Sequence, residues 1–255
     1  MSFHSIVLAA GRGSRMKRLT DDTPKCLTPL AGRPLLEWQM ESLRAAGTEN
    51  VTVVRGWQAQ KLSGAFDTID NEEWSTSNMV VTLSKASSLL SRSDCVVSYS
   101  DIVYHPDHVR ALLASPGDIA ITYDLDWLEL WKSRNEADPL ADAETFRQKD
   151  GWLEAIGKRP KDLSEVEGQY MGLLRFTPAG WSAVEQFLSS VSAERRNKLD
   201  MTTLLSLLLE SGAKIAAVPV RGKWCECDTE SDLEIYESIL ETARKEGRTW
   251  RHDWR

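Results

Sequence analysis

Residues 6–30 read IVLAAGRGSRMKRLTDDTPKCLTPL, a stretch that joins an apolar segment to a loop rich in glycine and basic side chains. The apolar run at 6–10 is typical of an interior parallel strand that is covered on both faces. Gly11 and Gly13 follow at once, and glycine lets bare backbone N–H groups approach an anion closely. The basic side chains of this loop are Arg12, Arg15, Lys17, Arg18 and Lys25. The stretch therefore predicts a strand that ends in a binding loop for a polyphosphate.

Two common glycine motifs do not fit this loop. A Walker A loop requires G-x-x-x-x-G-K-[ST], which the sequence lacks, and the dinucleotide fingerprint requires a third glycine where the chain has Met16. A G-x-G pair alone is compatible with an ordinary tight turn between a strand and a helix. The longer pattern LAAGxGxRM, followed by PKxL at 24–27, resembles the signature of nucleoside-triphosphate:sugar-phosphate nucleotidyltransferases.

The composition argues against several classes of function. Of the 255 residues, 42% are hydrophobic and 27% are charged, which allows an ordinary buried core. The formal net charge of -7 leaves no basic excess for binding nucleic acid or an anionic membrane surface. There is no apolar run long enough for a membrane span, no signal-peptide pattern, and no zinc-type spacing among the four cysteines. We expect a cytoplasmic protein with reduced cysteines and a small-molecule partner, and a homodimer is compatible with these features.

Strand and helix patterns alternate along the chain. The expected strands lie at 6–10, 51–54, 95–99, 119–123, 169–176 and 214–220. The expected helices lie at 34–46, 57–66, 127–132, 178–188, 201–211 and 230–246, with a further helix that begins near Pro106. In TSNMVVTLSKA at 76–86 we expect a loop, a strand and the start of a helix, and KDG at 149–151 predicts a hairpin turn. The pattern predicts an α/β, Rossmann-like three-layer sandwich with a mixed, mostly parallel sheet. We expect one domain over 1–255, with an inserted subregion at 124–175.

Carboxylates follow two of the predicted strands. Asp101 comes just after the strand at 95–99, and Asp228 ends the sequence WCECD, with Glu226 two residues earlier on the same strand face. Because ligands of open α/β sheets bind outside the carboxyl ends of the strands, Asp101 should lie at the same edge as the Gly11 loop. Carboxylate oxygens suit Mg²⁺, which transfer from a polyphosphate requires. We therefore predict a Mg²⁺ site formed by Asp101, Asp228 and Glu226.

The chain has no arrangement that suggests a nucleophile with a general base, because none of its four histidines stands in a Ser, Cys or acidic constellation. A phosphate or phosphonate oxygen that attacks as an anion needs no such base. Catalysis then depends on cations that hold two anions in line and screen their repulsion. Lys25 and Arg15, in a solvent-facing anion loop, are the first candidates, and Lys158 with Arg159 could bind the phosphate of the second substrate.

Several further segments resemble bacterial CTP:phosphocholine cytidylyltransferases and the related phosphonate cytidylyltransferases. They are YDLDWLELWKSR, PLxDAExF, AIGK, EGQYMGLLRF and WCECDT, and with the loop motifs they extend the likeness from about residue 5 to 240. The resemblance implies that CTP and a small phosphorylated or phosphonate acceptor give a CMP-linked product and pyrophosphate. It leaves two alternatives open, namely a sugar-1-phosphate nucleotidyltransferase that uses another nucleoside triphosphate and a regulatory homologue without activity.

The resemblance also implies roles for individual residues. The expected nucleotide-binding residues are Leu8, Ala9, Ala10, Gly11, Arg12, Gly13, Ser14, Asn78 and Ser100. The expected catalytic residues are Lys25, Arg15 and Lys158, with Asp101 and Asp228 as the two aspartates that bind Mg²⁺. One departure is visible, because Ser100 stands where the family commonly has glycine before the first metal aspartate.

The subregion at 124–175 is expected to bind the acceptor. It combines aromatic side chains with the carboxylates of Asp126, Asp142 and Glu144, and aromatic faces with carboxylates hold ammonium groups well. The residues predicted to bind the acceptor are Tyr123, Trp131, Glu144 and Tyr170. Phosphocholine, 2-aminoethylphosphonate and other amino or hydroxy phosphonates all remain possible acceptors.

Overall fold

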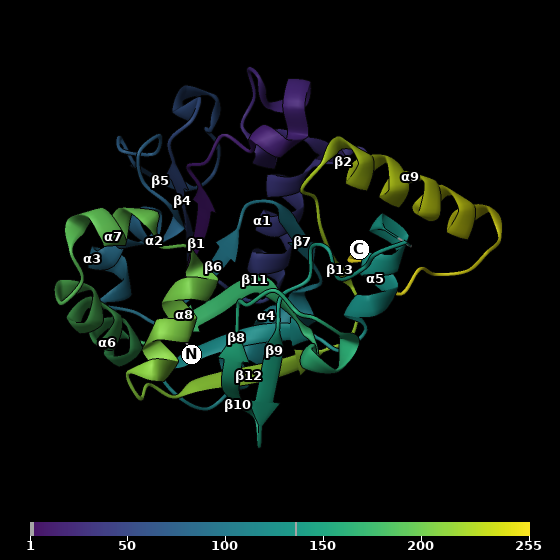
Figure 1. Cartoon of the computed structure of the whole chain (residues 1–255). Helices are drawn as coiled ribbons and strands as arrows, with labels where there is room; N and C mark the ends of the chain where they lie inside the picture. The colour runs from purple at the N-terminus through teal and green to yellow at the C-terminus, as the bar shows by residue number, and fades with distance from the viewer. Residues whose placement is uncertain (1–2, 136) are drawn as a thin grey trace.

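The computed structural model describes residues 3–135 and 137–255 (Figure 1). Within these residues, a nine-stranded sheet in the order β5-β4-β1-β6-β11-β8-β12-β10-β9 forms the middle layer. The strands are β1 His4–Ala9, β4 Asn50–Arg55, β5 Asp67–Asp70, β6 Cys95–Tyr99, β8 Ile119–Asp124, β9 Phe146–Lys149, β10 Trp152–Ile156, β11 Gln169–Phe176 and β12 Ile215–Val220. Only β10 and β11 are antiparallel to both of their neighbours among the described strands. The predicted mixed, mostly parallel sheet is confirmed.

Helices cover both faces of this sheet (Figure 1). Buried side chains of α1, α4, α5 and α9 pack on one face, and those of α2, α3, α6 and α8 pack on the other. The helices are α1 Leu35–Ala45, α2 Met79–Ser84, α3 Ser87–Leu90, α4 Pro106–Ala114, α5 Trp127–Arg134, α6 Pro178–Ser189, α7 Ala193–Lys198, α8 Met201–Glu210 and α9 Glu230–Lys245. In the described part of the chain, no helix has the length and apolar character needed to cross a membrane.

β1 occupies the interior position that its sequence predicts. It pairs in parallel with β4 on one side and with β6 on the other. Successive side chains of a strand point to opposite faces, so Ile6 and Leu8 join the core under α2 and α8, whereas Val7 and Ala9 join the core under α1 and α4. Two buried faces explain why this segment is apolar without interruption, and its carboxyl end places Gly11 at the edge of the sheet.

Two secondary-structure predictions are wrong. The segment 76–86, predicted to contain a strand, instead contains α2, because the Asn78 side chain caps this helix at Met79 N and the apolar side chains pack on the sheet. Packing here overrides the strand preference of β-branched residues. Residues 57–66, predicted as a helix, form only a short 3₁₀ turn at Ala59–Lys61. The Arg55 guanidinium there binds the carbonyl groups of Ala59 and Leu62, and the chain continues into the edge strand β5.

A separate two-stranded sheet joins two distant parts of the chain. β7 Ile102–Tyr104 follows β6, and β13 Trp224–Glu226 follows β12, and the two pair antiparallel with Glu226 opposite Ile102. The backbone N–H of Cys227 extends the pairing by donating to the carbonyl oxygen of Asp101 at 2.8 Å. This small sheet brings the ends of β6 and β13 side by side.

Candidate active site

The loop after β1 is shaped around Lys25. Gly13 has a φ of 67°, in the left-handed region, and it begins the 3₁₀ helix Ser14–Thr20. A Cβ atom at Gly13 would lie 2.9 Å from both the Cβ and the Cδ of Lys25, which is closer than such atoms normally approach. Glycine at this position therefore serves both the backbone conformation and the close packing of Lys25.

We predict that Gly13→Ala lowers kcat/KM for the nucleotide by about tenfold to a hundredfold, because the added methyl group displaces Lys25 or the loop. Steady-state kinetics of the purified variant measure this effect. The matched control is Gly151→Ala, at a hairpin tip where φ is also positive, at 80°, but where an added Cβ would meet nothing within 4 Å. Equal losses in the two variants would mean that backbone strain, and not contact with Lys25, causes the defect.

Lys25 is buried and bridges two acidic residues. Its Nζ donates to Asp101 Oδ2 at 2.8 Å and to Asp228 Oδ1 at 2.7 Å, and Arg15 Nη2 lies 2.9 Å from the same Asp228 oxygen. Burial opposes the charge of Lys25, but the two carboxylates outweigh burial and hold its pKa above the ordinary value. The expectation that Lys25 faces solvent is wrong, because only 7% of the residue is exposed. Arg15, in contrast, is exposed as expected.

Asp101, Glu226 and Asp228 form a carboxylate cluster. Among the described residues, each offers an oxygen within 4.8 Å of the others, and the pairing of β7 with β13 brings them together. Burial raises the pKa of Glu226 well above its usual range, and the neighbouring Asp228 adds to this effect. Burial acts in the same direction on Asp228, but Lys25 and then Arg15 outweigh it, so the pKa of Asp228 is lowered. The buried Asp101 Oδ1 has no hydrogen-bond partner in the described chain, and an all-oxygen cluster of this kind suits a hard divalent cation.

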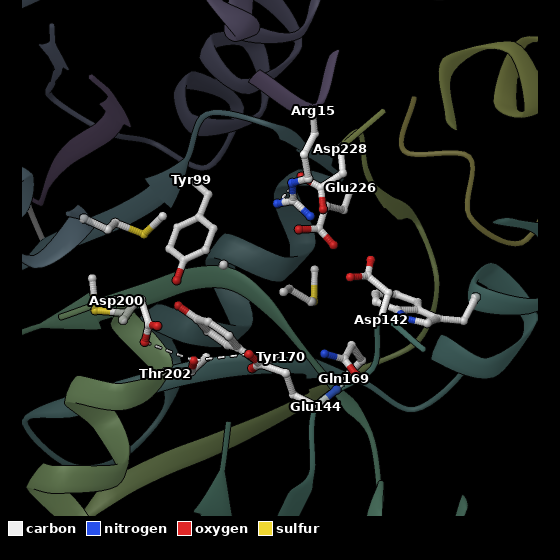
Figure 2. Close-up of a pocket in the computed structure, with 15 residues that line it drawn as sticks. Arg15, Tyr99, Asp142, Glu144, Gln169, Tyr170, Asp200, Thr202, Glu226 and Asp228 are labelled. Carbon is white, nitrogen blue, oxygen red and sulfur yellow. Dashed lines mark hydrogen bonds and ion pairs between the residues drawn. The ribbon is translucent and has the colours of Figure 1, made fainter. Parts of the chain in front are cut away.

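A pocket of about 280 Å³ opens beside this cluster (Figure 2). Its lining residues are Arg15, Met79, Tyr99, Trp131, Asp142, Glu144, Gln169, Tyr170, Met171, Gly172, Asp200, Met201, Thr202, Glu226 and Asp228. Figure 2 shows Arg15, Glu226 and Asp228 on one side and Glu144 with Thr202 on the opposite side. The pocket therefore has Arg15 with the carboxylates of Glu226 and Asp228 on one wall, next to the glycine loop. The second wall is supplied by β11 and the start of α8, together with Tyr99, Trp131, Asp142 and Glu144.

Three of the four predicted acceptor residues line this pocket, namely Trp131, Glu144 and Tyr170. The Glu144 carboxylate accepts a hydrogen bond from Thr202 Oγ1 at 3.3 Å, and burial raises its pKa. Tyr170 packs edge to face against Tyr99, with ring centroids 5.9 Å apart. The fourth, Tyr123, is not among the described lining residues, because its ring stacks on Phe146 in the core at 4.5 Å.

The predicted nucleotide-binding residues lie around the loop, with one exception. Leu8, Ala9 and Ala10 are buried at the end of β1, and the loop residues Gly11, Arg12 and Ser14 are exposed. Arg12 pairs with Asp21 and lies over the Trp57 ring, and Ser100 directly precedes Asp101 after β6. The exception is Asn78, which caps α2 and donates to the carbonyl oxygen of Lys198. Lys158, predicted to be catalytic, is exposed beyond β10 and is not among the described pocket residues.

Sequence reasoning missed several side chains of this site. Tyr99 ends β6, Gln169 begins β11, and Asp200 caps α8 with Thr202 in its first turn. Asp200 before an apolar run indicates the start of a helix. The sequence does not indicate that this helix start lies at the pocket. Arg134, at the end of α5, was also missed, although it lies 3.7 Å from Asp228.

An α/β fold with a glycine loop beside a carboxylate cluster suits a transferase that acts on nucleoside triphosphates. A family model described as the MobA-like NTP transferase domain matches residues 5–154, and the chain belongs to this family. The resemblance drawn from the loop motifs is thereby confirmed.

The chain is also similar to individual named proteins. The CTP:phosphoglutamine cytidylyltransferase of Campylobacter jejuni is 33% identical over 249 residues, covering 91% of this chain and 98% of the relative. A glucose-1-phosphate thymidylyltransferase of Streptomyces griseus is 24% identical over 255 residues, covering 94% of this chain and 66% of the relative. The structure of a CTP:phosphocholine cytidylyltransferase from Streptococcus pneumoniae has the same fold, with a TM-score of 0.68 and 16% identity over 94% of this chain and 100% of that one.

Proposed function

We propose that this protein is a cytidylyltransferase that transfers CMP from CTP to a small phosphate or phosphonate acceptor and releases pyrophosphate. The proposal rests chiefly on one observation, the pocket in which Asp228, bound through Lys25 to Asp101, faces a second wall of aromatic and acidic side chains. The 33% identity to the Campylobacter jejuni enzyme, over nearly the full length of both chains, favours CTP as the nucleotide.

The residues of the loop suit binding of the triphosphate. Backbone N–H groups from Gly11 to Ser14 can approach the phosphates closely, and Arg15 and Lys25 supply charge. An acceptor oxygen attacks the α-phosphorus, the bond from this phosphorus to the bridging oxygen breaks, and pyrophosphate leaves with the electron pair. The attacking phosphate or phosphonate is already an anion, so no residue needs to remove a proton. Lys25 would then hold the anions together and follow the charge that develops between them.

Asp101 and Asp228, with Glu226 beside them, would hold Mg²⁺. The set consists of carboxylates alone, and Asp101 carries an unpaired buried oxygen, which fits this ion. When bound, Mg²⁺ supplies charge screening between the two substrates and neutralises the leaving pyrophosphate. Lys25 contacts both aspartates and Arg15 contacts Asp228, so these two cations stand beside the residues that would hold the ion.

The second wall suits an acceptor with an ammonium group. Glu144, Asp142 and Asp200 contribute three carboxylates, and Tyr99 and Tyr170 contribute aromatic rings. A carboxylate that pairs with an ammonium and an aromatic face beside it stabilise the same cation. A pocket for a sugar would present more neutral hydrogen-bonding groups. Release of pyrophosphate with CTP, UTP, dTTP and GTP against phosphocholine, 2-aminoethylphosphonate and glucose 1-phosphate tests both the nucleotide and the acceptor, and a preference for the sugar would contradict this proposal.

We predict that Glu144→Gln raises KM for 2-aminoethylphosphonate by about tenfold or more, because a charge-assisted hydrogen bond to the amine is lost. KM for ethylphosphonate, which lacks only the amine, should change by less than about twofold. Since burial raises the pKa of Glu144, KM of the wild type for the amine should also rise as the pH falls toward that pKa. Glu241→Gln, on the exposed face of α9, is the control. Equal changes in KM for both acceptors would show that Glu144 does not bind the amine.

A further inference from the structure

One buried arginine joins the carboxylate cluster to the second wall of the pocket, the acceptor wall, which includes Trp131 and Asp142. Arg134 ends α5, and its side chain is only 8% exposed. Four carboxylates surround its guanidinium in the described part of the chain. The distances are 3.0 Å from Nε to Asp232 Oδ1, 3.2 Å from Nη2 to Asp142 Oδ2, 3.6 Å from Nη1 to Glu226 Oε2 and 3.7 Å from Nη2 to Asp228 Oδ2. A planar guanidinium with five donors can meet several carboxylates at once, which a lysine cannot do with the same geometry.

Arg134 fixes Asp228 in two ways. Directly, it faces Asp228 Oδ2, while Asp228 Oδ1 faces Lys25 and Arg15. Indirectly, it holds Asp232, whose Oδ2 accepts hydrogen bonds from the backbone N–H groups of Asp228 at 2.9 Å and Thr229 at 2.8 Å. Arg134 therefore contacts the Asp228 carboxylate directly and supports the Asp228 backbone through Asp232.

The same guanidinium also reaches the acceptor wall. The guanidinium carbon of Arg134 lies 5.1 Å from the centroid of the Trp131 ring. Trp131 and Asp142, which forms an ion pair with Arg134, both line the pocket. Asp142 is 58% exposed at its side chain, and its ion pair with Arg134 is a contact from the buried interior to this pocket-lining carboxylate. One side chain thus connects the residues that would hold the metal with the residues that would hold the acceptor.

We propose that Arg134 is a positioning residue for the transfer reaction, which keeps Asp228 and Glu226 aligned with the acceptor wall through Asp232, Asp142 and Trp131. This inference rests on the proposed cytidylyltransferase function. A purely structural arginine would stabilise the protein without affecting the cluster. Removal of a positioning arginine has two effects. It takes a positive charge away from the carboxylate cluster, and it leaves Asp228 and Glu226 no longer aligned with the acceptor wall. A divalent cation should then bind more tightly while the reaction becomes slower.

The test measures Mn²⁺ binding to the nucleotide-free protein by electron paramagnetic resonance, the melting temperature, and kcat for pyrophosphate release. We expect Arg134→Gln to bind Mn²⁺ about tenfold more tightly, because a nearby cation no longer repels it, and to lower kcat by about thirtyfold or more through lost alignment. Arg134→Lys keeps the positive charge but lacks the planar guanidinium with its several donors. Its Mn²⁺ affinity should match the wild type, whereas its kcat should be about tenfold lower than that of the wild type. Arg33→Gln is the matched control, since Arg33 also covers a tryptophan and pairs with two glutamates, but outside the site.

A folded Arg134→Gln protein with the Mn²⁺ affinity and kcat of the Arg33→Gln control would overturn the proposal and leave Arg134 a structural residue. If Arg134→Gln does not fold, Arg134→Lys decides, and a wild-type kcat in that variant would equally overturn it. Failure of the proposed function gives a different result, because the wild type would then release no pyrophosphate with any acceptor or would prefer glucose 1-phosphate, whereas the Mn²⁺ measurement does not depend on the reaction.

Discussion

Alanine at Asp101 or at Asp228 should lower pyrophosphate release by about a thousandfold or more, because each variant removes a carboxylate that would hold Mg²⁺ and no neighbour replaces the lost charge screening. Both residues stand at the point where β7 and β13 meet, in contact with Lys25 from the loop after β1. The measurement is kcat at saturating CTP and acceptor over a range of Mg²⁺ concentrations, with the melting temperature as a test of folding. Chelation of divalent ions should abolish the wild-type activity, and added Mg²⁺ should restore it.

The control for these variants is Asp107→Asn, which removes an exposed carboxylate that pairs with Arg110 on α4. Asp101→Asn and Asp228→Asn keep the size of the side chain and should be nearly as inactive as the alanine variants, which separates loss of the ligand from loss of packing. A folded variant at either position that turns over at nearly the wild-type rate would remove that residue from the metal site.

Lys25→Met should lower kcat by about a hundredfold or more, because the ammonium that follows the charge on the α-phosphate is gone. The same change leaves Asp101 and Asp228 close together in the interior without their shared cation. We therefore expect the variant to lose stability, by about 3–5 kcal/mol if the carboxylates stay ionised, and to bind Mn²⁺ more tightly than the wild type without nucleotide. Kinetics, thermal melts and Mn²⁺ titration measure the three effects.

Arg15→Ala provides the comparison for Lys25. Arg15 also contacts Asp228, but 62% of its side chain is exposed, so its loss should reduce nucleotide binding with little change in the melting temperature. If Lys25→Met affected only the affinity for CTP, and kcat remained near the wild-type value, the assignment of Lys25 to the transfer step would be wrong.

The sequence predicted a structural feature correctly where a single short stretch determines that feature. The uninterrupted apolar run of β1 reflects its two buried faces, and KDG marks the turn at Asp150 and Gly151, both at positive φ, between β9 and β10. The aspartate after β6 was located correctly because a strand end in an α/β sheet has a defined edge.

The remaining features depend on partners far apart in the sequence. The sequence does not indicate that β13 pairs with β7, although that pairing brings Asp228 to Asp101. It also does not indicate that α8 begins at the pocket, so Thr202 could not be identified. Lys25 looked like a surface cation because lysine is rarely buried, and only two carboxylates from distant segments make its burial favourable.

The position of β11 has a consequence for how the protein is synthesised. β11 lies between β6 and β8 and is antiparallel to both, although residues 169–176 follow both strands in the chain. While a ribosome is still translating the first 168 codons, β6 has no partner on one side, and the nascent chain presents an open apolar edge that can pair with other chains. We expect arrested chains that end before residue 169 to aggregate or to bind chaperones more than chains that extend past residue 176, in which β11 can cover the open edge of β6.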